Sequence, residues 1–186
     1  MREVLPRCDR CQLPAPQCLC AAIPRVDTRV EVVILRHIKE GGRSSNTGKL
    51  AHLALPNSRL LTHGLPHQPL DPEAWRGAWL LYPGGGATPP EAVERLVVLD
   101  GSWRQVGRML RRIPGLATLP RFSLPEARAD GPRMRRPPHP EGRATLEAAA
   151  EALTLLEGPA TGAPLWALFE LAVARLRESR GRSAPP

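Results

Sequence analysis

An acid, a hydroxyl and an aromatic ring follow one another where an apolar run ends, in the segment VVLDGSWRQVGRML. Asp100 falls at the expected end of a strand and beside the expected start of a helix, a placement that favours its ionised form. Ligands of open α/β sheets bind beyond the carboxyl ends of the strands, so Asp100 is a candidate site residue. Asp-Gly is also a common turn pair, and position alone leaves both interpretations open.

The residues after Asp100 predict a capped amphipathic helix from Trp103 to about Arg112. Ser102 followed by Gln105 has the spacing of a capping box. The apolar positions form a stripe that predicts the buried face: Val106, Met109, Leu110 and Ile113. Guanidinium groups on or near the opposite side suit phosphate binding, although a solvated helix face has the same pattern: Arg104, Arg108, Arg111 and Arg112.

All four cysteines lie in the segment CDRCQLPAPQCLC, at Cys8, Cys11, Cys18 and Cys20. In a chain expected to be cytosolic, four thiolates this close predict a tetrahedral Zn²⁺ site rather than two disulfides. Four protein ligands leave no position for a catalytic water, so the site is expected to be structural. The segment offers little else to build a core, and the metal is the expected source of its order.

Two further segments carry polar or flexible residues at expected strand ends. YPGGGA, from Tyr82 to Ala87, contains three glycines that let backbone amides approach a ligand closely. HIKEGGRSSNTG lies between a strand and a helix and holds a dense polar cluster, which includes His37, Arg43 and Asn46. A loop that caps the next helix through Asn46 or Thr47 explains part of this cluster, and we expect both roles to hold.

The elements that must position these residues alternate between strands and helices. Strands are predicted over residues 29–37, 58–64, 78–86 and 94–100, with a fifth within 117–124. Helices are predicted over residues 45–55, 103–112, 145–156 and 164–177. This alternation predicts an α/β fold with a mostly parallel sheet flanked by helices. We expect a zinc-binding segment over residues 1–28, a catalytic domain over 29–178 and a disordered tail over 179–186.

Charge and hydropathy narrow the class of partner. The chain has 186 residues and a formal net charge of +8, which favours an anionic partner, most often nucleic acid. A composition rich in arginine can mimic this signature. No apolar run approaches the roughly 20 residues that span a bilayer, and no secretory signal is evident at Met1 to Arg7. We therefore expect a soluble protein in the cytoplasm.

Five segments in one order make the chain resemble the DTW-domain family of tRNA-uridine aminocarboxypropyltransferases. That family is named for an Asp-x-Thr-Trp motif, which reads Asp100-Gly-Ser-Trp103 here. The family's cysteine cluster corresponds to CDRCQLPAPQCLC, and its His-x-x-Glu and Ser-Asn-Thr-Gly segments correspond to HIKEGGRSSNTG. Its strand that ends in Tyr/Phe-Pro corresponds to LLYPGGGA, and its Thr-Leu-Glu helix start corresponds to ATLEAAAEAL. Ser102 departs from the family threonine but keeps the hydroxyl. The three glycines replace residues that are often polar or acidic in relatives.

The resemblance implies a SPOUT-like fold, in which the chain can form a trefoil knot. It also implies a reaction that uses S-adenosylmethionine. The family transfers the 3-amino-3-carboxypropyl arm, not the methyl group, to N3 of a uridine in tRNA and releases methylthioadenosine. Asp100 would then act as the general base or hold the amino group of the donor. Trp103 would stack on the target base or on adenine, although a core aromatic is an equal alternative.

The resemblance also implies two sets of binding residues. The donor would contact Leu81, Tyr82, Pro83, Gly84, Leu99, Thr145, Leu146 and Glu147, with Asp100, Ser102 and Trp103 as the catalytic group. The RNA would contact His37, Arg43, Asn46, Arg104, Arg108, Arg111, Arg133, Arg135 and Arg136. Two alternatives stay open: a related aminocarboxypropyl- or methyltransferase acting on ribosomal RNA, and a zinc-ribbon RNA-binding protein without enzymatic activity. A monomer and a homodimer are both compatible with the sequence.

Overall fold

Five parallel strands form a single sheet at the centre of the protein, in the order β2-β1-β4-β3-β5. The computed structural model describes residues 6–43, 47–86, 88, 92–126 and 142–181. The strands are β1 (Glu31–His37), β2 (Ser58–His63), β3 (Trp79–Gly86), β4 (Arg95–Asp100) and β5 (Arg121–Phe122). The predicted α/β class with a largely parallel sheet is confirmed, and the trefoil knot stays a prediction.

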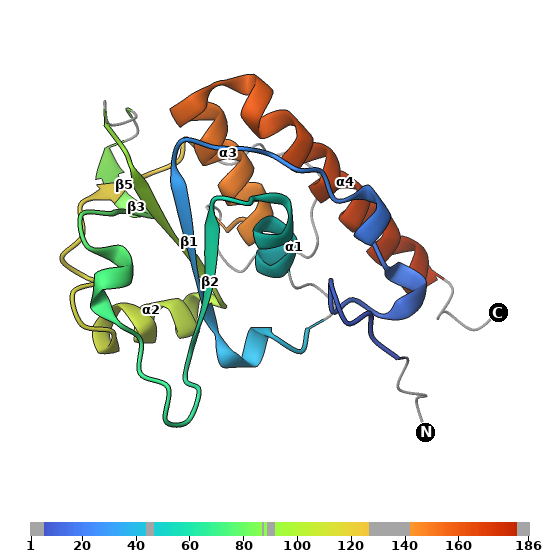
Figure 1. The fold of residues 1–186 in the computed structure, drawn as a ribbon, viewed down its shortest axis with the longest axis horizontal. Coiled ribbons are helices and arrows are strands. Elements are labelled where there is room, and N and C mark those ends of the chain that lie inside the picture. The colour runs from blue at the N-terminus through green and yellow to red at the C-terminus, as the bar shows by residue number, and fades with distance from the viewer. Residues whose placement is uncertain (1–5, 44–46, 87, 89–91, 127–141, 182–186) are drawn as a thin grey trace.

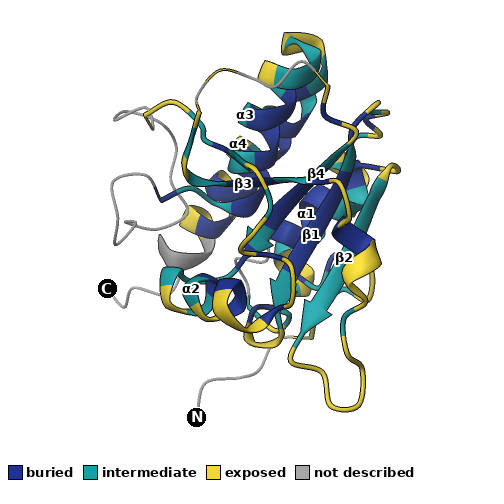
Figure 2. Ribbon diagram, turned by 90° about the vertical axis from the view of Figure 1, so that its left-hand side faces the viewer, coloured by how far each residue is buried: buried dark blue, intermediate teal, exposed yellow. Residues whose placement is uncertain are grey.

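Helices cover both faces of this sheet (Figure 1). Three of them, α1 (Thr47–Ala54), α3 (Thr145–Glu157) and α4 (Pro159–Gly181), share one apolar core with the first face. The opposite face packs against α2 (Trp103–Arg112) and the short 3₁₀ helix η4 (Pro72–Trp75). Figure 2 shows exposed residues along the outer side of α2, away from the sheet.

The two cores explain why β1 reads as an almost unbroken apolar run. Val32 and Ile34 point into the core with α1, α3 and α4, whereas Val33 and Leu35 point into the core with α2. Successive side chains of a strand alternate between faces, so a strand covered on both faces must be apolar at every position. β1 is therefore an inner strand of the sheet, between β2 and β4, and its carboxyl end emerges between the two layers.

The last helix begins five residues earlier and ends four residues later than the sequence predicts, so residues 179–181 of the predicted disordered tail are helical, and residues 182–186 lie outside the described residues. Gly158 ends α3 with φ at +101°, and α4 starts directly at Pro159, so Pro164 lies inside the helix instead of opening it. Gly158-Pro159 is a stronger signal for a helix boundary than Pro164 is, because glycine suits the end of one helix and proline suits the first turn of the next. A Cβ on Gly162 would lie 1.8 Å from the Thr154 Oγ1, so α3 and α4 pack too closely there for any other residue.

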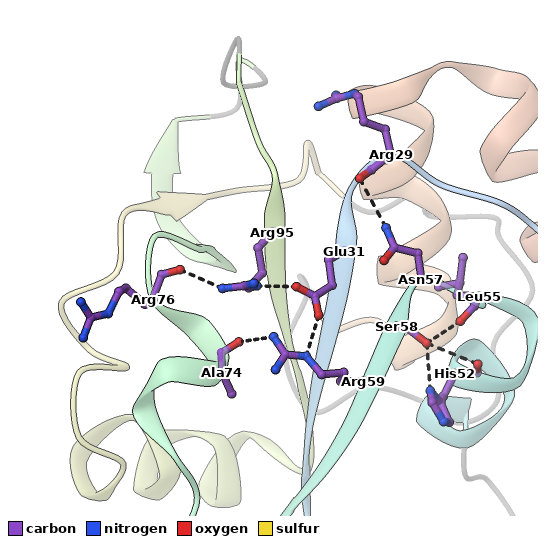
Figure 3. A network of polar contacts seen from close by, with 10 residues as sticks. All are labelled: Arg29, Glu31, His52, Leu55, Asn57, Ser58, Arg59, Ala74, Arg76 and Arg95. Atoms are coloured by element: carbon purple, nitrogen blue, oxygen red, sulfur yellow. Dashed lines mark hydrogen bonds and ion pairs between the residues drawn. The ribbon is translucent and has the colours of Figure 1, made fainter.

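A carboxylate joins three strands at their amino ends (Figure 3). Asp100 ends β4 and therefore lies at the opposite edge of the sheet. Glu31 in β1 contacts the Nε atoms of Arg95 at 2.5 Å and Arg59 at 2.6 Å, which belong to β4 and β2. The two arginines also donate to the carbonyl oxygens of Arg76 and Ala74. Partial burial opposes ionisation of Glu31, but the hydrogen bonds from Arg95 and Arg59 outweigh it and lower the pKa of its carboxyl group. This network stabilises the sheet away from the candidate site.

The N-terminal cysteine segment packs on the core shared by α1 and α4. It contains two 3₁₀ helices, η1 (Ala15–Gln17) and η2 (Cys20–Ala22). Leu13 and Leu19 are buried in that core, so metal binding is not the segment's sole source of order, contrary to the sequence-based expectation. The boundary at residue 28 stays a prediction. In the described part of the chain, no helix is both long and apolar enough to cross a membrane.

Candidate functional site

Asp100 is buried at the carboxyl end of β4, where the starts of α1 and α3 meet it. The Thr145 hydroxyl donates to the Asp100 Oδ1 at 2.6 Å, and the Thr145 backbone N–H donates to the Thr47 Oγ1 at 3.2 Å. These two bonds join residues far apart in sequence. They fix the carboxylate relative to both helix starts, which is how a group at a reaction centre must be held.

Gly48 makes this convergence possible. A Cβ built on Gly48 would lie 2.5 Å from the Asp100 Oδ2 and 2.7 Å from its Cγ. Such distances are shorter than any real contact of this kind, so α1 can approach Asp100 only with glycine at this position. The Thr-Gly pair in the SSNTGKL segment therefore supplies both a hydroxyl for α3 and the space for the carboxylate.

The residues after Asp100 form the predicted capped helix. The Ser102 N–H donates to the Gln105 Oε1 at 2.6 Å, and the Gln105 N–H donates to the Ser102 Oγ at 3.4 Å. The predicted buried stripe is confirmed, since its four apolar residues lie in the core between α2 and the sheet. Trp103 is half-buried and faces Tyr82, with ring centroids 6.0 Å apart and an angle of 57° between the ring planes. The capping box thus orients Trp103 toward the end of β3.

A cavity opens at this edge between β3, β4, α2 and the start of α3. Five of the eleven residues predicted to contact substrate or donor line it: Leu81, Tyr82, Pro83, Leu99 and Trp103. Sequence reasoning missed the rest of the lining: Val98, Gly101, Val106, Ser123, Leu124, Arg143 and Ala148. Most of the lining residues are apolar or aromatic, while polar atoms supply nearly half of the exposed lining surface. A cavity with a few polar side chains at the carboxyl ends of parallel strands is typical of a small-molecule site.

Six predicted site residues lie beside this cavity but do not line it: Gly84, Asp100, Ser102, Thr145, Leu146 and Glu147. The two neighbours of Asp100, Leu99 and Gly101, line the cavity while Asp100 points toward α1 and α3. Leu146 is fully buried in the core, and the Glu147 carboxylate accepts a hydrogen bond from the Ala144 N–H at 3.0 Å. Their placement indicates structural contacts at the start of α3.

The glycines after Pro83 serve the packing of β3 against β5. Gly84 has φ at +90°, and a Cβ on Gly85 would lie 2.2 Å from the Arg121 carbonyl oxygen. The Ser123 hydroxyl accepts from the Gly85 N–H at 2.9 Å and donates to the Tyr82 carbonyl at 3.1 Å. The Arg121 guanidinium lies over the Tyr82 ring, 5.2 Å from its centroid. β5 therefore holds the aromatic side of the cavity in place.

The predicted RNA-binding residues fall into three groups. Arg104, Arg108 and Arg111 are exposed on the outer side of α2, as their spacing predicts. Their i, i+4, i+7 spacing places the three on one face of that helix. At the end of β1, His37 lies beside His63 of β2, and Arg43 forms an ion pair with buried Glu40 at 3.3 Å. The remaining four lie outside the described residues: Asn46, Arg133, Arg135 and Arg136.

His37 has a direct role in local structure as well. Its Nδ1 accepts a hydrogen bond from the Lys39 N–H at 3.2 Å and so caps the 3₁₀ helix η3 (Ile38–Glu40). Burial and then the neighbouring His63 lower the pKa of the His37 imidazole. A His37 that accepts at Nδ1 carries its proton at Nε2, which leaves a neutral ring with one donor directed away from the backbone.

The four cysteine sulfur atoms lie within 4.8 Å of one another. The Cys8 and Cys20 sulfurs are 3.5 Å apart, and those of Cys11 and Cys18 are 3.8 Å apart. The backbone N–H groups of Cys11 and Arg10 lower the pKa of the Cys8 thiol to about 6, whereas burial raises the pKa of Cys20 to about 12. Four convergent sulfurs without a disulfide fit a tetrahedral cation site, and a divalent cation would stabilise all four thiolates.

Two missed residues of the cavity had weak signals in the sequence. Arg143 stands directly before the Thr-Leu-Glu helix start, at the end of a stretch rich in Pro and Arg that favours irregular structure. Ser123 lies within the segment predicted as a possible fifth strand, which is confirmed over two residues only. Neither pattern specifies which side chains turn inward, because that depends on how β5 and α3 dock on the sheet.

Comparisons with known proteins identify relatives of this chain. The model of the DTW domain matches residues 5–177. The chain is 30% identical over 172 residues to tRNA-uridine aminocarboxypropyltransferase 2 of Drosophila melanogaster, an alignment that covers 81% of this chain. The alignment spans 66% of that relative, just under two thirds of its length. No solved structure matches the chain.

Proposed function

The chain belongs to the DTW-domain family, and on that premise we propose that it transfers the 3-amino-3-carboxypropyl group of S-adenosylmethionine to N3 of a uridine in tRNA. One observation carries the proposal beyond family membership. The Asp100–Trp103 segment, the Tyr82-Pro83 strand end and the start of α3 meet at one cavity on the carboxyl edge of a parallel sheet. Segments far apart in the chain thus form one site where such sheets bind ligands.

The cavity suits the donor in its chemistry. Its apolar residues and the Tyr82 and Trp103 rings suit a flat base and a thioether, and Arg143 supplies positive charge at the same cavity. The donor would supply an activated leaving group, since its sulfonium departs as a neutral thioether. The protein then has to position the reactants, exclude water and accept one proton, and no metal is required for these tasks.

The proposed reaction balances as a substitution at carbon. A bond forms between uracil N3 and the arm carbon next to sulfur, while the bond from that carbon to sulfur breaks. The bonding pair moves to sulfur, which becomes neutral in methylthioadenosine. The N3 proton leaves to a base, either a side chain or water. The protein contributes most by alignment, because the attacking nitrogen, the carbon and the sulfur must lie in line.

Asp100 has two roles open to it, and ligand binding separates them. A carboxylate that anchors the donor's ammonium group predicts weaker binding of S-adenosylhomocysteine by Asp100→Asn. If the carboxylate instead removes the N3 proton, Asp100→Asn should bind S-adenosylhomocysteine as the wild type does but transfer the group more slowly. Asp100 also orders both helix starts through Thr145, so Asp100→Asn must first match the thermal stability of the wild type.

The tRNA surface is proposed on the side of the cavity that α2 borders. The exposed Arg104, Arg108 and Arg111 lie on the helix that begins at Trp103, so the same helix joins the cavity to a basic face. Arginine suits phosphate, because its planar group can donate two parallel hydrogen bonds. We also propose a cytoplasmic location, as the sequence predicts.

Zinc is proposed for the cysteine cluster in a structural role. The four sulfurs converge, and the segment that carries them packs on α4 and α1 through Leu13 and Leu19. A closed tetrahedral site binds no water for chemistry, and its effect on activity would pass through the stability of this packing.

The nucleoside by-product tests the proposed reaction. The chain is incubated with unmodified tRNA and S-adenosylmethionine, and the small molecules are separated by liquid chromatography with mass detection. We expect methylthioadenosine to appear only when tRNA is present. S-adenosylhomocysteine in its place would identify a methyltransferase. Turnover with ribosomal RNA but not with tRNA would identify ribosomal RNA as the substrate. Binding of tRNA without any by-product would favour an RNA-binding protein without enzymatic activity.

A further inference from the structure

One charged side chain faces the cavity, and no role in the reaction has been assigned to it. Among the described residues that line the cavity, Arg143 is the only one that carries a charge. Its side chain is 7% exposed, whereas the arginines of α2 are exposed. Burial of a guanidinium is costly unless it is paired, so its location at the wall of a ligand cavity calls for an explanation.

Two neighbours hold Arg143 in a fixed position. Its Nε lies 2.5 Å from the Glu151 carboxylate in α3, and its Nη2 donates to the Pro125 carbonyl oxygen. A guanidinium has five N–H donors, so a side chain that other groups hold in place can still donate to a ligand. Held in this way, Arg143 loses little side-chain entropy when a ligand binds.

The position of Arg143 in the chain relates it to Asp100. Arg143 lies two residues before Thr145, whose hydroxyl donates to the Asp100 carboxylate. The neighbours of Asp100 on both sides, Leu99 and Gly101, line the same cavity as Arg143. The Asp100 carboxylate itself points toward α1 and α3, so among the described residues Arg143 alone brings a charge to the cavity. A ligand that carries a carboxylate on an otherwise uncharged or cationic body matches this single guanidinium.

We propose that Arg143 binds the α-carboxylate of the donor's 3-amino-3-carboxypropyl group, an assignment that rests on the function proposed above. The contact would orient the arm. The arm carbon next to sulfur, rather than the methyl carbon, would then face N3 of the uracil. An RNA phosphate is a poorer candidate for this arginine, because Arg143 lines the cavity and is 7% exposed, whereas the arginines of α2 are exposed on the surface. Arg143 is thus a substrate-binding residue that selects which group is transferred.

A pair of ligands that differ only in this carboxylate tests the assignment. Calorimetry measures the binding of S-adenosylhomocysteine and of its decarboxylated analogue, which keeps the amine, to the full chain. We expect the wild type to prefer the carboxylate ligand by about ten- to a hundredfold, the range for a hydrogen bond between charged groups. In Arg143→Gln this preference should disappear, while the affinity for the decarboxylated analogue should change little.

Glu151→Gln is the matched control, because it breaks the same ion pair and leaves the guanidinium in place. It should keep most of the preference for the carboxylate ligand. If Arg143→Gln does not fold, Arg143→Lys replaces it, and the single ammonium should keep the folded state but reduce the preference. A preference that is unchanged in a folded Arg143 variant, or lost equally in Glu151→Gln, would assign Arg143 to structure alone and overturn the inference.

The proposed function fails in a different way from the assignment. If the wild type binds neither nucleoside, the donor itself is wrong, and the assignment falls with it. If the wild type binds both ligands with equal affinity, the donor class stands and only the carboxylate contact is refuted.

Discussion

The contact between α1 and Asp100 predicts that Gly48→Ala destabilises the protein, although alanine is normally the better residue in a helix. The new Cβ would lie 2.5 Å from the Asp100 Oδ2, so either the carboxylate or the helix must move. Helix propensity favours alanine over glycine by about 1 kcal/mol. Overpacking a buried site costs about 1–3 kcal/mol, and weakening the bond to Thr145 adds to that cost.

The net expectation for Gly48→Ala is a loss of about 1–3 kcal/mol in the free energy of unfolding. Urea unfolding at fixed pH and fixed zinc concentration measures it. Gly107→Ala in α2 is the matched control, since a Cβ there would lie 3.7 Å from the Arg111 Nη1, an ordinary contact. That variant should be equally stable or gain up to about 1 kcal/mol.

The two variants therefore make the same substitution in helices, and only Gly48→Ala should lose stability. If Gly48→Ala is as stable as Gly107→Ala or more so, α1 does not approach Asp100 as described. The convergence of β4, α1 and α3 on this carboxylate would then be wrong, and the site with it.

Three further predictions concern other parts of the molecule. Removal of zinc by a chelator, or Cys18→Ser, should lower the melting temperature, because the cysteine segment packs on the core with α1 and α4; zinc-free protein of unchanged stability would contradict this. Glu31→Gln should cost about 1 kcal/mol at neutral pH in urea unfolding, a modest value because the carboxylate is partly exposed. The pKa of Glu31 is lowered in the folded state, so its contribution to the free energy of unfolding is present above the unfolded pKa of about 4.3 and is lost as the pH falls through the folded pKa. A difference in stability between the wild type and Glu31→Gln that persists in strong acid would contradict this. Replacing Arg104, Arg108 and Arg111 together by alanine should weaken tRNA binding and lower its salt dependence by about 0.7–0.9 in log–log slope for each phosphate that the protein no longer neutralises.

The arginine substitutions have a control of equal charge on other surfaces. Arg25, Arg175 and Arg177 are exposed and lie outside α2. Their combined replacement by alanine should leave most of the tRNA affinity and salt dependence in place. An equal loss of affinity in both triple variants would mean that net charge, not the α2 face, binds the RNA.

Features that depend on neighbouring residues could be predicted from the sequence. The capping box at Ser102 and the buried stripe of α2 repeat at helical spacing, and both are confirmed. The two-sided apolar pattern of β1 follows from burial of both sheet faces. Cysteine spacing alone brings the sulfur atoms of Cys8 and Cys11 together. Each of these patterns is a local consequence of backbone geometry.

Features that depend on how distant elements dock could not be predicted in this way. The bond between Thr145 and Asp100 joins residues 45 apart in the chain, and nothing near either residue specifies it. Arg143 looked like one more arginine of an irregular stretch, and only the docking of α3 turns it toward the cavity. The glycines after Pro83 suggested ligand contact, yet Gly85 is needed for the close approach of β5.

The most direct test of the proposed function follows the donor's arm into RNA. The chain is incubated with unmodified tRNA and S-adenosylmethionine labelled either on the carboxypropyl arm or on the methyl group, and the RNA is digested to nucleosides. We predict label from the arm alone, on a uridine, and its loss in Asp100→Asn. Label from the methyl group alone, or no label in tRNA that is bound, would contradict the proposal.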